Sequence, residues 1–107
     1  MKRVLSIQDL SCLGKCSLTV AQPVVSAMGC SCTPLPTALL SSHTAFSNPY
    51  RRLLTEDMKE ICQCWQYVGA KFDVISVGYL ADPIQATAVE QVLDAFPGYT
   101  IVDPVMG

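Results

Sequence analysis

Segments with the patterns of strands and of helices alternate along this sequence, and that alternation constrains its fold more than any other feature. Four short apolar runs are typical of strands, at residues 2–8, 30–35, 72–77 and 99–102. Three longer segments place apolar residues at helical spacing, at residues 16–28, 55–69 and 82–96. Such alternation indicates parallel strands joined by right-handed crossovers. We therefore predict an α/β fold, with a parallel sheet covered by helices on both faces. Half of the 107 residues are hydrophobic, which suits strands buried on both sides.

The ends and buried faces of the later helices follow from capping signals and apolar spacing. We expect Thr55 as one N-cap, and Asp82 as the other, with Pro83 at the first helical position and Gln85 in a capping box. Gly29 is expected just beyond the end of the first helix. The predicted apolar stripe of the second helix comprises Met58, Ile61, Cys62, Trp65 and Val68. That of the third comprises Ile84, Ala88, Val92, Leu93 and Phe96.

Polar residues follow each predicted strand. Asp9 opens a predicted turn over residues 9–15. A segment rich in Ser, Thr and His, predicted as a loop or a short extended piece, covers residues 37–48. Gly78 and Tyr79 follow the third strand, and Asp103 follows the fourth. In open parallel sheets ligands bind beyond the carboxyl ends of the strands. The pattern therefore predicts a small-molecule site at this edge.

Six cysteines raise the question of a metal or disulfide framework. Their spacings are C-x3-C for Cys12 and Cys16, and C-x-C for the pairs at 30 and 32 and at 62 and 64. None is the paired C-x2-C of structural zinc sites. Residues two apart in a helix lie roughly 200° apart around its axis, so Cys62 and Cys64 would not share an ion. We expect mostly buried free thiols, with metal and disulfide roles as alternatives.

Charge and hydropathy exclude several classes of partner. The formal net charge is −2, and isolated basic pairs such as Arg51 and Arg52 form no basic stripe that could bind nucleic acid. No run approaches the roughly 20 apolar residues of a membrane span. The apolar stretch after Met1 ends at Gln8, too early for a secretory signal. We expect a cytoplasmic protein with no nucleic-acid or membrane partner.

Four blocks of the sequence resemble the successive blocks of pyridoxal and pyridoxamine (vitamin B6) kinases, members of the ribokinase-like superfamily. These blocks are IQDLSCLGKCSLTVAQPVVSAMG, LPTALLSSHTAFSN, VISVGYLADPIQ and IVDPVMG. Together they run through nearly the whole chain. The resemblance implies a truncated three-layer α/β/α domain, with residues 1–107 forming its N-terminal, substrate-binding part. It also implies transfer of the ATP γ-phosphoryl group to the 5′-hydroxymethyl group of a B6 vitamer, with Mg²⁺, in a homodimeric enzyme.

The resemblance assigns roles to five residues. Asp9 stands where several such kinases have a serine that contacts the ring substituents, and its carboxylate would accept a hydrogen bond from a ring hydroxyl or protonated ring nitrogen. His43 and Thr44 match the ring pocket, and Tyr79 matches an aromatic residue that packs on the ring. Asp103 matches an acidic residue near the ATP phosphates and the metal.

The part of such kinases that performs the transfer has no counterpart in these residues. The family's G-x-G-D segment, whose aspartate is the general base, is absent and is expected beyond residue 107. No P-loop motif occurs either. We therefore predict that this chain alone is inactive in phosphoryl transfer. Two other interpretations stay open. One is a hydroxymethylpyrimidine kinase, which Asp9 favours and the blocks His43-Thr44 and Gly78-Tyr79-Leu80 disfavour. The other is a non-catalytic ligand-binding or assembly module.

Overall fold

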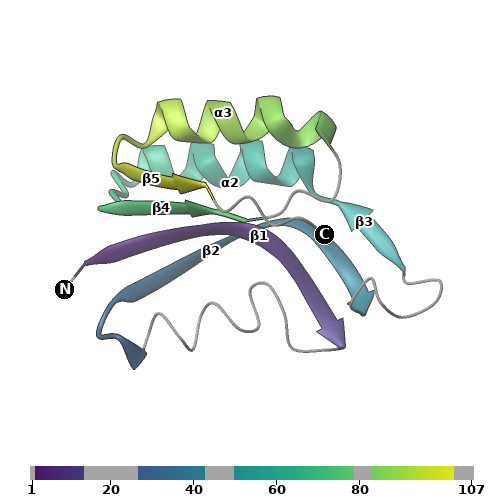
Figure 1. Ribbon diagram of the computed structural model, residues 1–107. Helices are drawn as coiled ribbons and strands as arrows, with labels where there is room; N and C mark the ends of the chain where they lie inside the picture. The colour runs from purple at the N-terminus through teal and green to yellow at the C-terminus, as the bar shows by residue number, and fades with distance from the viewer. Residues whose placement is uncertain (1, 14–26, 43–49, 79–82, 103–107) are drawn as a thin grey trace.

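A five-stranded sheet organises the computed structural model, which describes residues 2–13, 27–42, 50–78 and 83–102 (Figure 1). The order of the strands across the sheet is β3-β2-β1-β4-β5. Their bounds are Arg3–Leu13 (β1), Ser31–Ser42 (β2), Arg51–Leu53 (β3), Val74–Val77 (β4) and Tyr99–Val102 (β5). The α-helices are Thr55–Tyr67 (α2) and Ala86–Ala95 (α3), and a 3₁₀ turn, η1, covers Pro83–Gln85.

Four of the strands are parallel, as the sequence predicts, and the fifth is not. β1 pairs in parallel with β2 and β4, and β4 pairs in parallel with β5. β3 runs antiparallel to β2, with Leu53 opposite Ala38. β3 is not predicted from the sequence, because three residues are too few to show a period.

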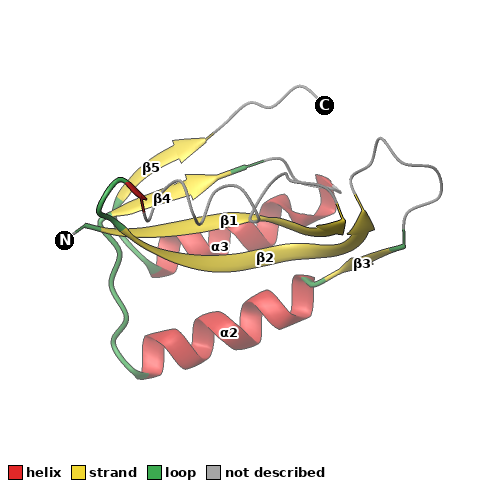
Figure 2. Ribbon diagram, turned by 90° about the horizontal axis from the view of Figure 1, so that it is seen from below, coloured by secondary structure: helices red, strands yellow, loops and turns green. Residues whose placement is uncertain are grey.

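The hydrophobic core lies between the sheet and the helices α2 and α3, which cover the same face side by side (Figures 1 and 2). Three aromatic rings close one end of it: Trp65, Phe72 and Phe96 meet edge to face, with centroids 5.4 to 6.2 Å apart. Burying an apolar side chain of this size contributes about 1.5–3 kcal/mol. The buried members of the core are Leu5, Ile7, Leu35, Met58, Cys62, Phe72, Ile75, Val77, Ala88, Val89, Val92 and Phe96.

The predicted α/β class is confirmed, since a mostly parallel sheet carries helices in the order expected. The helix predicted at residues 16–28 lies almost wholly outside the described residues, so the second helical layer stays a prediction. Gly29, predicted to follow that helix, has φ of +79°, the left-handed conformation that suits a glycine after a helix.

β1 and β2 both continue through segments predicted as irregular. β1 includes Asp9 and reaches Leu13, so the turn predicted at residues 9–15 is wrong for residues 9–13. β2 reaches Ser42, so residues 37–42 are extended, which is the second of the two conformations predicted for residues 37–48. The two strands pair with each other over this length, and the ladder outweighs the weak strand propensity of the polar residues.

Two prolines, which usually mark the end of a strand, lie inside β2 at positions 34 and 36. Both residues pair with β1 on one side, opposite Ser6 and Gln8. On the other side β3 pairs only with Ala38–Leu40, so no described strand borders the prolines there. They therefore occupy an edge portion of β2, where a missing N–H is tolerated.

The expected N-cap Thr55 is wrong, and the expected N-cap Asp82 lies outside the described residues. Leu54, not Thr55, is the N-cap of α2, and it makes no side-chain capping bond. The turn η1 precedes α3, whose N-cap is Gln85 itself, without a side-chain capping bond. The side chains of Thr55 and Gln85 contact each other instead, since Nε2 of Gln85 donates to Oγ1 of Thr55 at 3.2 Å.

Two residues of the predicted apolar stripes are exposed. Val68 lies beyond the end of α2, in the turn that Gly69 completes with φ of +74°. Ile84 lies in η1, whose tighter winding places side chains at a different angle from an α-helix. The other members of both stripes are buried or half-buried.

Candidate functional site

Asp9 is the one predicted site residue that the structure describes. His43, Thr44, Tyr79 and Asp103 lie outside the described residues, and their roles stay predictions. Asp9 and its neighbours form the described part of the candidate site.

Asp9 lies on the part of β1 that extends past its neighbour β4. β4 pairs with β1 only from Val4 to Ile7, and the N–H of Gly78 closes this pairing by donating to the carbonyl of Ile7 at 2.9 Å. From Gln8 onward, β1 has a described strand on its β2 side only. The chain passes from β1 to β2 on one side of the sheet and returns to β4 on the other. Such a switch point, at the carboxyl end of the strands, is where open α/β sheets bind ligands.

The Asp9 carboxylate is held below the surface. The residue is 7% exposed, and the hydroxyl of Ser11 donates a hydrogen bond to its Oδ2 at 3.1 Å. Side chains two apart on a strand share a face, so both point to the same side as Ile7, toward the layer of α2 and α3. A buried carboxylate oriented in this way can accept hydrogen bonds from a polar ligand.

A bulge in β2 stands opposite Asp9. Gln8 faces Pro36 and Leu10 faces Leu39, so two residues of β2, Thr37 and Ala38, oppose Asp9 alone. Bulges often re-aim side chains beside functional sites. The carbonyl of Thr37 accepts two hydrogen bonds, from the N–H of Leu54 at 2.9 Å and from Nε2 of Gln85 at 2.6 Å.

Gly78 packs closely against β1. A Cβ atom at this position would lie 2.6 Å from Cγ of Gln8, well inside van der Waals contact. The Gln8 side chain is held there by a hydrogen bond from its Nε2 to Oγ of Ser6 at 3.0 Å. The glycine therefore allows β4 to end directly beside the open edge of β1.

The sequence places Ser11 and Thr37 in segments predicted near this site, but it does not predict their contacts, and Gln85 is not predicted to belong to this region. Ser11 falls in the predicted turn, although its spacing of two from Asp9 would join them on one face of a strand. Thr37 falls in the predicted loop, and the local pattern around Gln85 indicates only a cap. The contact between Gln85 and Thr37 spans 48 residues in the sequence, and no local pattern reveals it.

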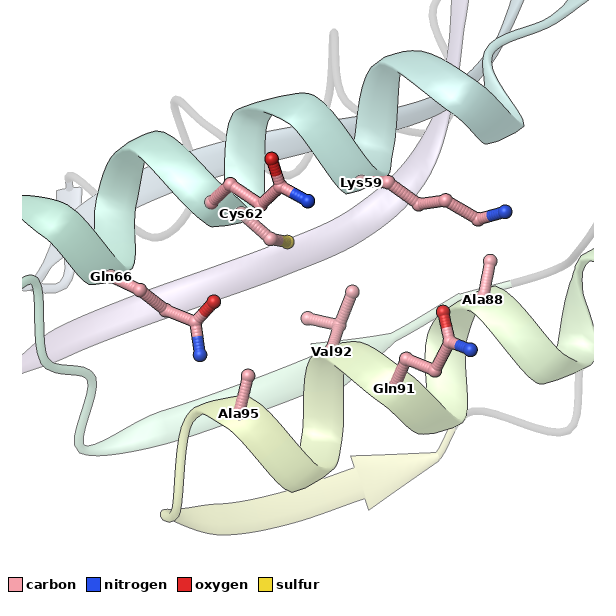
Figure 3. A pocket seen from close by; sticks show the side chains of 8 residues that line it. Lys59, Cys62, Gln66, Ala88, Gln91, Val92 and Ala95 are labelled. Atoms are coloured by element: carbon pink, nitrogen blue, oxygen red, sulfur yellow. The ribbon is translucent and has the colours of Figure 1, made fainter.

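A separate small cavity of about 210 Å³ lies between α2 and α3 (Figure 3). Its residues come from the two helices alone: Lys59, Cys62, Gln63, Gln66, Ala88, Gln91, Val92 and Ala95. Burial raises the pKa of the Cys62 thiol. The cavity is smaller than the roughly 300–1,000 Å³ of ligand pockets and does not include Asp9.

The described cysteines are free, but they are not mostly buried as expected. Cys12 and Cys64 are exposed, Cys30 and Cys32 are half-buried, and Cys62 alone is buried. Cys62 and Cys64 lie on opposite faces of α2, one toward the core and one toward solvent, as their spacing predicts.

The described residues do not assemble a metal site or a membrane span. Over residues 2–13, 27–42, 50–78 and 83–102, no three His, Cys, Asp or Glu side chains gather where they could hold a metal ion. These residues alone do not fit a magnesium ion, and the predicted ligand Asp103 lies outside them. In the same part of the chain, no helix has the length and hydrophobicity needed to cross a membrane.

Solved structures similar to this chain include kinases. A protein from Bacteroides thetaiotaomicron, described as a phosphomethylpyrimidine kinase and crystallised with pyridoxal, is 38% identical and superposes with a TM-score of 0.92 over 99% of this chain. Pyridoxal kinase from Lactobacillus plantarum is 30% identical, with a TM-score of 0.91 over 100% of this chain. The chain shares the fold of the pyridoxal kinases. The resemblance predicted from the four sequence blocks is thereby confirmed.

The match to pyridoxal kinases covers only part of their length. This chain spans 38% of the Bacteroides protein and 39% of the Lactobacillus pyridoxal kinase. Pyridoxal kinase from Leishmania donovani, solved in complex with ADP, has the same fold at 21% identity, with a TM-score of 0.82 and 40% of its length covered. No protein-family model and no curated protein matches the sequence.

Proposed function

We propose that this chain is the substrate-binding part of a kinase that phosphorylates the 5′-hydroxymethyl group of pyridoxal, pyridoxamine or pyridoxine. The observation that carries the proposal is Asp9, a buried carboxylate at the switch point of the sheet, beyond the end of β4. A protein of 38% identity with the same fold was crystallised with pyridoxal, which supports a B6 vitamer as the ligand.

Asp9 would bind the pyridine ring by charge-assisted hydrogen bonding. A ring hydroxyl or a protonated ring nitrogen donates to the carboxylate, and such bonds are shorter and stronger than those between neutral groups. The hydroxyl of Ser11 already donates to Oδ2, so it orients the carboxylate before the ligand arrives. Phosphoryl transfer depends chiefly on positioning and charge neutralisation, and this contact would serve the positioning.

The remaining parts of the site come from residues outside the described ranges. His43, Thr44 and Tyr79 would line the ring, and Asp103 would lie near the ATP phosphates and Mg²⁺. The general base would come from a segment that corresponds to none of these 107 residues. Nucleotide use is supported by a kinase of the same fold that was solved with ADP. In this proposal the chain alone binds a vitamer but transfers no phosphoryl group.

A pyrimidine substrate is the second candidate. The Bacteroides protein, which shares more of its sequence with this chain than the Lactobacillus kinase does, is described as a phosphomethylpyrimidine kinase. A carboxylate at position 9 would accept hydrogen bonds from an aminopyrimidine as well as from a pyridine hydroxyl. The two substrates therefore have to be distinguished by measurement.

Equilibrium titration tests the binding part of this proposal. Pyridoxal, pyridoxamine and hydroxymethylpyrimidine are titrated calorimetrically into the wild-type chain and into Asp9→Asn, which keeps the shape and removes the charge. Loss of a hydrogen bond to a charged group should weaken vitamer binding at least about tenfold. Asp94→Asn, the same change at an exposed position on α3, is the control and should bind like wild type.

A phosphorylation assay with Mg-ATP tests the activity. The chain alone should turn over no substrate, whereas a longer protein that contains it should phosphorylate a B6 vitamer. Turnover of the pyrimidine alone would replace the vitamer with the second candidate. A wild-type chain that binds neither ring, or an Asp9→Asn variant with unchanged affinity, would contradict the proposed site.

A further inference from the structure

Gln85 is a fully buried polar residue where three segments meet. It ends η1 and is 0% exposed. Its Nε2 donates to the carbonyl of Thr37 in β2 at 2.6 Å and lies 3.2 Å from Oγ1 of Thr55, the first residue of α2. One side chain thus joins β2, the start of α2 and the segment before α3.

The Thr37 carbonyl belongs to the bulge opposite Asp9. Thr37 falls in the register shift between β1 and β2, and its carbonyl accepts from the N–H of Leu54 and from Gln85. A carbonyl oxygen has two lone pairs, so the Gln85 amide supplies a second hydrogen bond beside that of Leu54 and fixes the orientation of this peptide group of the bulge. The amide of Gln85 therefore stabilises the bulged conformation of β2.

The buried amide of Gln85 is an inefficient way to stabilise the fold, because it leaves polar atoms without hydrogen-bond partners. Among the described residues, Oε1 of Gln85 and Oγ1 of Thr37 are buried and have no hydrogen-bond partner. Burying such groups unpaired destabilises a fold, and an apolar side chain of similar size at position 85 would avoid part of that cost. The amide of Gln85 adds specificity, because its hydrogen bond to the carbonyl of Thr37 forms only when β2 has the observed register against β1.

We propose that Gln85 is a positioning residue that holds the bulge of β2 and thereby sets the surroundings of Asp9. If β2 slipped by one residue, Leu40 and Ser42, now 2% and 8% exposed, would turn to the opposite face. The two residues that oppose Asp9 would change at the same time. The consequence for ligand binding rests on the proposed function, whereas the hold on the bulge does not.

The test compares Gln85→Met with Gln91→Met, the same change at an exposed position on α3. Hydrogen exchange is followed residue by residue in both variants of the full chain. Gln85→Met should raise exchange at Ala38–Leu40 about tenfold more than at Ile75–Val77 of β4. It should shift the amide resonances of Asp9 and weaken pyridoxal binding about tenfold. Gln91→Met should do none of these.

A second variant keeps the test decisive if Gln85→Met does not fold. In Gln85→Glu the buried carboxyl tends to stay protonated and can donate one hydrogen bond to Thr37. It should retain more protection at Ala38–Leu40 than Gln85→Met, or fold where Gln85→Met does not.

Two results would overturn the positioning role. One is an equal loss of protection in β2 and β4, which would mean that Gln85 serves stability alone. The other is unchanged exchange at Ala38–Leu40 together with an unchanged resonance of Asp9. If the wild-type chain binds no pyridoxal, the proposed function fails by itself, and exchange and resonance still decide the role of Gln85.

Discussion

Gln8 and Gly78 show how single residues shape the open edge of β1. The side chain of Gln8 packs against the backbone at position 78, where an added Cβ would lie 2.6 Å from the Cγ of Gln8. The Nε2 of Gln8 donates a hydrogen bond to Oγ of Ser6. Gly78 also donates the last hydrogen bond of the pairing between β4 and β1. β4 therefore ends where Gly78 packs against Gln8. Beyond this point β1 has no described strand on that side.

Gly78→Ala should therefore destabilise the fold. The added methyl group displaces the Gln8 side chain and breaks its bond to Ser6, an overpacking effect of about 1–3 kcal/mol. Urea denaturation measures the loss in the free energy of unfolding. In a Gln8→Ala background the clash is absent, so the same glycine substitution should cost much less. Equal costs in both backgrounds would show that the contact with Gln8 is not the cause.

At the scale of elements, α2 separates two cysteines by their environment. Cys62 faces the core and is 7% exposed, whereas Cys64 faces solvent on the same helix. Burial raises the pKa of Cys62, because the charged thiolate is poorly solvated there. The thiol of Cys62 is therefore less accessible than that of Cys64, and it ionises less readily than a thiol in water.

We predict that Cys64 is alkylated before Cys62. A thiol with a raised pKa stays protonated to higher pH, and the thiolate is the nucleophile. At pH 8, iodoacetamide should label Cys62 roughly tenfold more slowly than Cys64, and raising the pH should increase labelling of Cys62. Peptide mass spectrometry after timed quenching reports both sites in one sample. Equal rates in the folded chain would contradict the prediction, and equal rates in urea are the control.

At the scale of the whole molecule, the sheet has an exposed border at β5. Its large apolar residues Tyr99, Ile101 and Val102 are 71%, 48% and 63% exposed, and the strand pairs with β4 alone among the described residues. Exposed apolar edge strands are sites of association between chains. The homodimer implied by the resemblance stays a prediction, but this border is a surface on which copies of the chain can meet.

We predict that the chain self-associates through β5 and that Ile101→Lys reduces this association. A lysine on an edge strand opposes strand pairing between molecules. Sedimentation velocity over a range of concentrations should show larger species for wild type and fewer for the variant. Val68→Lys, at an exposed aliphatic residue beyond α2, is the matched control. A wild-type chain that stays monomeric, or an equal effect of both lysines, would contradict the prediction.

The sequence by itself determined the α/β class, four of the strands and the later two helices. The apolar periods of these segments are local properties of the chain, and they predict which side chains are buried. Met58 of α2 and Ile75 of β4, both predicted within apolar segments, are fully buried. The blocks that carry the resemblance to pyridoxal kinases are also local. Asp9 was found as a candidate ligand contact from its place after an apolar run, although that place proved to be within β1.

Only the tertiary structure decided how far β1 and β2 extend, where β2 bulges and what Gln85 does. Strand length depends on the neighbour that completes the ladder, and Ser11 and Leu40 pair across a gap of 29 residues in the sequence. Gln85 carries the local signal of a helix cap, yet its amide donates to the carbonyl of Thr37, which also accepts from the N–H of Leu54. Such long-range hydrogen bonds have no period, so no pattern along the chain predicts them.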